Sequence, residues 1–93
     1  MVELEYEFAL NNEIVSFQKE HPELEVELKT INYANGCKID KVVLTDTDSG
    51  FAANVFIPYR TYRNFSYMQF VQDLQNKLDS ALRDIQLVLE AKT

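Results

Sequence analysis

The residues that could do chemistry are few in this chain. His21 is the only histidine and Cys37 is the only cysteine. A Ser-His-Asp or Cys-His arrangement needs a histidine base, but His21 directly precedes Pro22 at the predicted end of a helix, where capping and surface roles are more common. A lone cysteine forms no internal disulfide and no four-cysteine metal site, which favours a reducing compartment. We therefore expect no catalytic residue.

Metal and cofactor sites are not expected either. Glu20, Glu23 and Glu25 are close to His21 in sequence, but such neighbouring positions do not all point the same way on a helix or a strand. The segment 46–50 (DTDSG) begins like a calcium loop, yet its glycine comes one position early and the twelfth position is an isoleucine. The chain has only 2 glycines, so a Gly-rich phosphate loop is absent. The sequence predicts a protein that is not an enzyme.

Two alternating runs of glutamates are candidate partner contacts. Residues 1–28 carry 8 of the 15 acidic side chains and only 1 of the 9 basic ones. On extended strands alternate residues are ~7 Å apart, a phosphate-like spacing that would repel nucleic acid and attract a basic groove. The simpler interpretation is that such glutamates keep the outer face of a strand solvated. The two runs are Glu3, Glu5 and Glu7, then Glu23, Glu25 and Glu27.

The segment 59–65 (YRTYRNF) interleaves aromatic residues with two arginines. Aromatic stacking beside guanidinium groups is a way of binding single-stranded nucleic acid. Because the whole chain is acidic, with a net charge of -6, we disfavour direct nucleic-acid binding. We expect these aromatics to close one end of the core and the arginines to pair with nearby carboxylates.

The N-terminal residues 2–8 alternate apolar residues with glutamates, which predicts a strand with one buried face. The alternative is a helix over residues 3–20, since Glu and Leu are good helix formers, but its apolar residues scatter on a helical wheel. From Ala9 the apolar spacing becomes helical until His21-Pro22, which predicts a short N-terminal helix.

The middle of the chain predicts a three-stranded meander. Asn35-Gly36 is a strong signal for a two-residue hairpin turn, and the loop 46–50 would make a second hairpin. Counting back from the first turn places Leu28 opposite Val43. The same register gathers an apolar patch on the opposite face of the sheet, which would mark an interface if nothing covers it. This patch comprises Ile31, Val42, Leu44 and Phe56, with Tyr33 at its rim.

The C-terminal third predicts one long helix. Pro58 ends the third strand, and Ser66 with Gln69 makes a capping box, with Asn64 as a competing cap. Apolar residues then recur in steps of four and three over roughly 25 residues. They are Tyr67, Val71, Leu74, Leu78, Ala81, Ile85 and Val88.

The 93 residues are expected to form a single α+β domain: a small antiparallel meander of three to four strands packed against a long C-terminal helix, with a short N-terminal helix. No apolar run approaches the ~18 residues of a membrane span, and the acidic start is unlike a secretory signal. These features favour a cytoplasmic protein.

The functional prediction follows from missing chemistry and interface-like features. We expect a small acidic protein that binds a partner protein, with a homo-oligomer as an open option because the end of the long helix around Leu87 could meet a second subunit. The alternative is an acidic nucleic-acid mimic that inhibits a DNA- or RNA-binding protein, as phages and mobile elements use. The partner contacts would come from the six glutamates together with Ile31, Tyr33 and Phe56.

Overall fold

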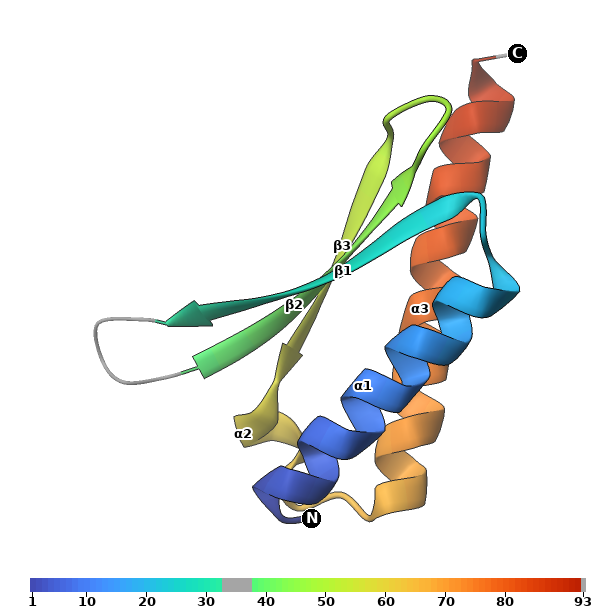
Figure 1. The fold of residues 1–93 in the computed structure, drawn as a ribbon. Coiled ribbons are helices and arrows are strands. Elements are labelled where there is room, and N and C mark those ends of the chain that lie inside the picture. Colours follow the sequence, from blue (N-terminus) through green and yellow to red (C-terminus); the bar gives the residue numbers. More distant parts are fainter. Residues whose placement is uncertain (33–37, 93) are drawn as a thin grey trace.

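The computed structural model of this protein describes residues 1–32 and 38–92. Tyr33, the predicted turn at Asn35-Gly36, and Cys37 lie outside the described residues. The elements follow one another as a long helix, three strands, one helical turn and a second long helix (Figure 1). They are α1 (Glu3–Glu20), β1 (Leu24–Asn32), β2 (Lys38–Asp46), β3 (Ala52–Pro58), α2 (Tyr59–Tyr62) and α3 (Tyr67–Ala91).

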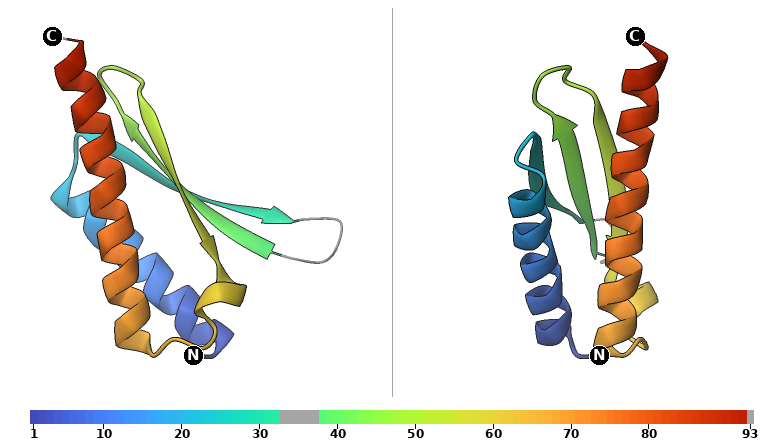
Figure 2. Two further views of the ribbon diagram at one scale, coloured as in Figure 1. Left: turned by 180° about the vertical axis from the view of Figure 1, so that it is seen from behind. Right: turned by 90° about the vertical axis from the view of Figure 1, so that its right-hand side faces the viewer.

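The two long helices form one layer and the sheet forms the other (Figures 1 and 2). The strands pair antiparallel in the order β1-β2-β3. This arrangement confirms the predicted α+β fold, in which a β-meander packs against a long C-terminal helix and an N-terminal helix. All elements contribute to one buried cluster, because an amphipathic helix and a half-apolar sheet each need a partner layer.

The predicted register of the meander is wrong by one residue. Leu28 pairs with Val42 and Val26 with Leu44, whereas Val43 had been predicted opposite Leu28. The shift turns Val42 and Leu44 toward the helices, where both are fully buried. A slip of one residue exchanges the two faces of a strand. The burial of apolar residues under the helices therefore sets the register, and counting back from the turn assigned the wrong face.

The strand predicted for residues 2–8 is also wrong, and the helical alternative over residues 3–20 is confirmed by α1. The buried residues of α1 include Tyr6, Ala9, Leu10 and Phe17, which lie on one side of a 3.6-residue helix. The sequence suggested a strand because the positions between the glutamates are all apolar, including residues that do not belong to the buried side of α1.

The long C-terminal helix confirms its prediction. α3 spans 25 residues and buries Leu74, Leu78, Ala81 and Ile85 at the predicted positions. Phe70, which the predicted repeat did not include, is its most deeply buried aromatic residue. Phe70 also fits the spacing of three and four residues, so the prediction had the correct period but left out one buried residue.

Ser66 is the N-cap of α3, as predicted. The backbone N–H of Gln69 donates to Ser66 Oγ at 3.2 Å, and the backbone N–H of Ser66 donates to Gln69 Oε1 at 2.9 Å. We expect Ser66→Ala to lower the free energy of unfolding by about 1 kcal/mol, because it leaves a helix N–H without its partner. Urea denaturation followed by circular dichroism measures this, and Ser80→Ala, at an exposed position within α3, is the control that should stay near wild type.

A buried polar cluster ties α1 to the sheet. Asp40 is the one charged residue buried in the part of the chain that the structure describes. It accepts hydrogen bonds from the Tyr6 hydroxyl at 2.7 Å and from the Thr30 hydroxyl at 2.8 Å. The Tyr6 hydroxyl also lies 3.0 Å from the carbonyl oxygen of Ile57. Because a buried carboxylate is costly without such partners, these contacts link α1 to all three strands.

Candidate binding surface

The outward face of the sheet is the side that neither long helix covers (Figure 2). Alternation along each strand places on it the residues that do not face the helices. Phe56 is 53% exposed there, although it is an apolar aromatic residue. Ile31 lies on this face too, so the prediction that these two share an uncovered face agrees with the register. Val42 and Leu44, the other predicted members, are buried on the opposite face.

Two lysines lie side by side on the outward face. Lys29 pairs with Lys41 across β1 and β2, and Lys41 pairs with Phe56 across β2 and β3. Like charges directly opposite each other on neighbouring strands destabilise a sheet. The ion pair of Lys29 with Glu27, at 4.0 Å and exposed, offsets little of this cost. The row is therefore electrostatically unfavourable in the isolated chain.

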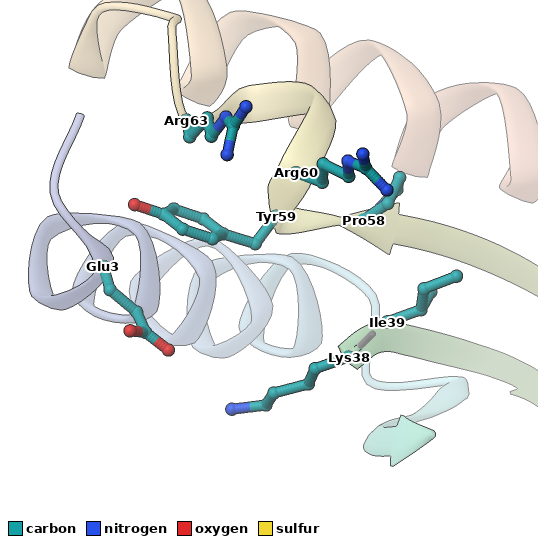
Figure 3. A pocket seen from close by; sticks show the side chains of 7 residues that line it. All are labelled: Glu3, Lys38, Ile39, Pro58, Tyr59, Arg60 and Arg63. Atoms are coloured by element: carbon teal, nitrogen blue, oxygen red, sulfur yellow. The ribbon is translucent and has the colours of Figure 1, made fainter. Parts of the chain in front are cut away.

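A pocket of about 530 Å³ opens at one end of this face (Figure 3). Ile39 and Pro58, which end the outward row next to the lysine pair, belong to its lining, so the pocket and the face are continuous. Tyr59 supplies an aromatic wall, and the charged side chains come from three elements. They are Glu3, Lys38, Arg60 and Arg63.

The chain positions the two arginines through α2. Pro58 ends β3, and the single turn of α2 follows directly. The Tyr59 hydroxyl donates to the backbone carbonyl of Met1 at 3.0 Å, and the N-terminal ammonium group donates to the carbonyl of Arg63 at 2.8 Å. Both contacts hold α2 against the start of α1. The guanidinium groups of Arg60 and Arg63 stay on the surface while the buried ring of Tyr62 anchors the turn.

Five of the chain's 9 basic side chains gather on this continuous area. We call it the basic surface; its charged members are Lys29, Lys38, Lys41, Arg60 and Arg63. Lys38 is 3.8 Å from Glu7, but Arg60 and Arg63 make no ion pair with any described residue. The predicted pairing of the arginines with carboxylates is therefore wrong. The other part of that prediction is confirmed, since Tyr62 is buried and Phe65 packs edge-on against it at 5.0 Å.

The six predicted glutamates do not form two matching ladders. Glu3, Glu5 and Glu7 lie on α1, where steps of two residues turn roughly 200° around the axis, so neighbours point apart. In the second run, Glu25 and Glu27 are exposed on the outward face of β1. Glu23 precedes the strand and lies 3.3 Å from His21 Nδ1. Tyr33, the remaining predicted contact, is outside the described residues.

Arg60 and Arg63 were not among the predicted contact residues, although the interleaved aromatic and arginine segment had marked their position. That pattern pointed to these two residues, but it gave no information on whether their guanidinium groups would form ion pairs with carboxylates. Tertiary structure decides this, because the one acidic residue among those that line the pocket, Glu3, lies on α1 and is far from the arginines in sequence.

The fold and this surface define a two-layer α+β protein with one open sheet face, on which Lys29 and Lys41 lie beside Glu25 and Glu27. Comparison of the chain with protein-family models, curated proteins and solved structures finds no match. In residues 1–32 and 38–92, no group of three or more acidic, histidine or cysteine side chains is placed to hold a metal ion. None of the helices described is both long and apolar enough to cross a membrane.

Proposed function

We propose that this protein is a non-enzymatic interaction module that binds an acidic segment of a partner protein on its basic surface. The observation that carries the proposal is the convergence of five basic side chains, two of them arginines without an ion pair, around exposed apolar residues in a chain of net charge -6. Arginine presents a planar fork that binds carboxylates bidentately, so Arg60 and Arg63 suit an acidic peptide.

The unfavourable lysine row supports the same partner class. An acidic segment lying across Lys29 and Lys41 would remove their mutual repulsion on binding. Phe56 and the pocket wall at Tyr59 supply apolar contact beside the charges, which is the composition of an anchor at a protein interface. Nucleic acid fits less well, because Tyr62, an aromatic ring of the segment beside the arginines, is buried in the core and unable to stack on bases.

The alternative, an acidic nucleic-acid mimic, receives less support from this geometry. A mimic needs regularly spaced charges over an extended surface, and only Glu25 and Glu27 share one strand face at such a spacing. Glu7 is within 4 Å of Lys38, so its charge is partly offset within the chain.

The test is a selection from a displayed peptide library, followed by titration of the selected peptides. We expect enrichment of acidic sequences that contain an aromatic or aliphatic residue. Arg60→Glu with Arg63→Glu should weaken their binding about a hundredfold or more, since each reversal puts a like charge in a contact. Arg83→Glu, an exposed change on α3 with the same chemistry, is the matched control and should bind like wild type.

Two outcomes would remove the proposal. One is a selection without acidic enrichment, and the other is equal binding by the doubly reversed variant and wild type. A single-stranded oligonucleotide that binds the basic surface more tightly than every selected peptide would also overturn the assignment to a protein partner. Added salt should weaken peptide binding, because screening reduces exposed charge contacts.

A further inference from the structure

α1 carries a second apolar stripe on the side away from the core. Leu4, Phe8 and Val15 are 78%, 63% and 53% exposed. With Asn11 they follow steps of four, three and four residues, so all four lie within roughly 60° of one line along the helix. The core residues Tyr6, Ala9, Leu10 and Phe17 occupy the opposite side. α1 is thus apolar on two opposite faces.

A helix with apolar residues on both sides is characteristic of one buried between two layers. One side of α1 packs on α3 and on the sheet, as Figures 1 and 2 show. The stripe lies on the opposite side of the helix from the buried residues, and its apolar side chains are exposed. Isolated exposed apolar residues are ordinary, but three large ones on a single line mark an interface. A second subunit was predicted at the end of α3. Leu87 and Val88 are exposed there, but they do not form a row of apolar residues along one face of the helix.

We propose that the stripe packs against the same stripe of a second copy, with the two α1 helices antiparallel and Asn11 at the centre. This goes beyond the proposed partner binding and shares no residue with the basic surface. Steps of four and three are the spacing of a helix–helix seam. Antiparallel packing about Asn11 sets Phe8 against Val15 of the second copy, and the twofold axis repeats that contact.

Charge selects a second copy in this orientation. In the antiparallel arrangement, Glu5 lies beside Lys19 of the second copy, and both residues border the stripe on the same side of the helix. The helix dipoles are then also opposed. Asn11 donates to the backbone carbonyl of Glu7 at 2.9 Å, so its side-chain oxygen can accept from Asn11 of the second copy.

The first test is the molar mass by analytical ultracentrifugation over a range of protein concentrations. We expect a dimer that dissociates on dilution. Phe8→Asp should raise its dissociation constant about thirtyfold or more, the effect of losing one hot-spot side chain. Met68→Asp is the matched control, because Met68 is an equally exposed apolar residue at the start of α3. A mass that is monomeric throughout, or unchanged by Phe8→Asp, would overturn the proposal.

Two further sets of substitutions distinguish a specific helix–helix interface from non-specific hydrophobic association. Asn11→Leu should tighten the dimer about tenfold without larger species, since a polar residue in a seam costs stability. Glu5→Lys and Lys19→Glu should each weaken it, and the double exchange should restore it. Higher aggregates with Asn11→Leu, or a double exchange weaker than both single ones, would contradict antiparallel packing. The melting temperature of each variant's monomer is measured as well, so that a loss of folding is distinguished from a loss of dimerisation.

Discussion

Phe70→Ala should lower the free energy of unfolding by about 3 to 5 kcal/mol, the usual cost of removing a buried phenylalanine. Phe70 is fully buried, and its ring lies 5.1 Å from that of Tyr6 and 5.0 Å from that of Tyr62. It therefore joins α3 to α1 and to α2 at the end of the core below the pocket. In a small domain with a total stability of about 5 to 15 kcal/mol, this loss leaves a large unfolded population.

Urea denaturation followed by circular dichroism gives the value directly. Met68→Ala, two residues earlier on the same helix, is the control and should change stability by less than about 0.5 kcal/mol, because Met68 is exposed. A cost below about 1 kcal/mol for Phe70→Ala would contradict the three-ring arrangement. Phe70→Leu should cost less than the alanine change, since more of the volume stays filled.

Alkaline pH should destabilise the fold through Tyr6 and Tyr62. Both side chains are buried, and burial raises the pKa of each above its ordinary value of 10.0. Asp40 raises the Tyr6 pKa further, and Asp73, which accepts from the Tyr62 hydroxyl at 2.6 Å, does the same for Tyr62. In the folded state the two phenols therefore stay neutral at a pH where the unfolded chain has lost their protons.

The sign of the effect follows from this difference. The stabilising contribution is fully present below the unfolded pKa of about 10 and is lost as the pH rises above it, by about 1.4 kcal/mol per pH unit for each tyrosine. Urea denaturation at several values between pH 8 and pH 12 measures the slope. Tyr6→Phe and Tyr62→Phe should each remove about half of it. A stability that stays level through this range, or a slope unchanged in both variants, would refute the assignment.

The predicted fold was accurate where local signals and burial agree. The capping box at Ser66 and the apolar repeat of α3 use contacts between residues three or four apart, which are visible in sequence. The loop before β3 was predicted for the same reason, and Gly50 has the positive φ of 79° that its turn chemistry suggested. These elements depend little on the rest of the chain.

The predicted contact residues were placed correctly only in part, because which face of a strand or helix is exposed depends on tertiary packing. Ile31 and Phe56 share the outward face, whereas Val42, predicted beside them, lies under the helices. The glutamates of α1 could not be placed while residues 2–8 were read as a strand. The stripe of Leu4, Phe8 and Val15 was hidden by the same prediction, since strand alternation assigned Leu4 and Phe8 to a buried face and separated them from Val15 in the predicted helix.

The sequence alone determined the number and order of the central elements, the long capped C-terminal helix, and the lack of a recognisable catalytic motif. These properties depend on residue type and short spacing. Tertiary structure alone decided the register, the burial of Asp40, and the gathering of Lys38, Arg60 and Arg63 around one pocket. The physical reason is that burial and charge are properties of the whole packed chain: which face of a strand or helix is covered is set by elements far away in sequence.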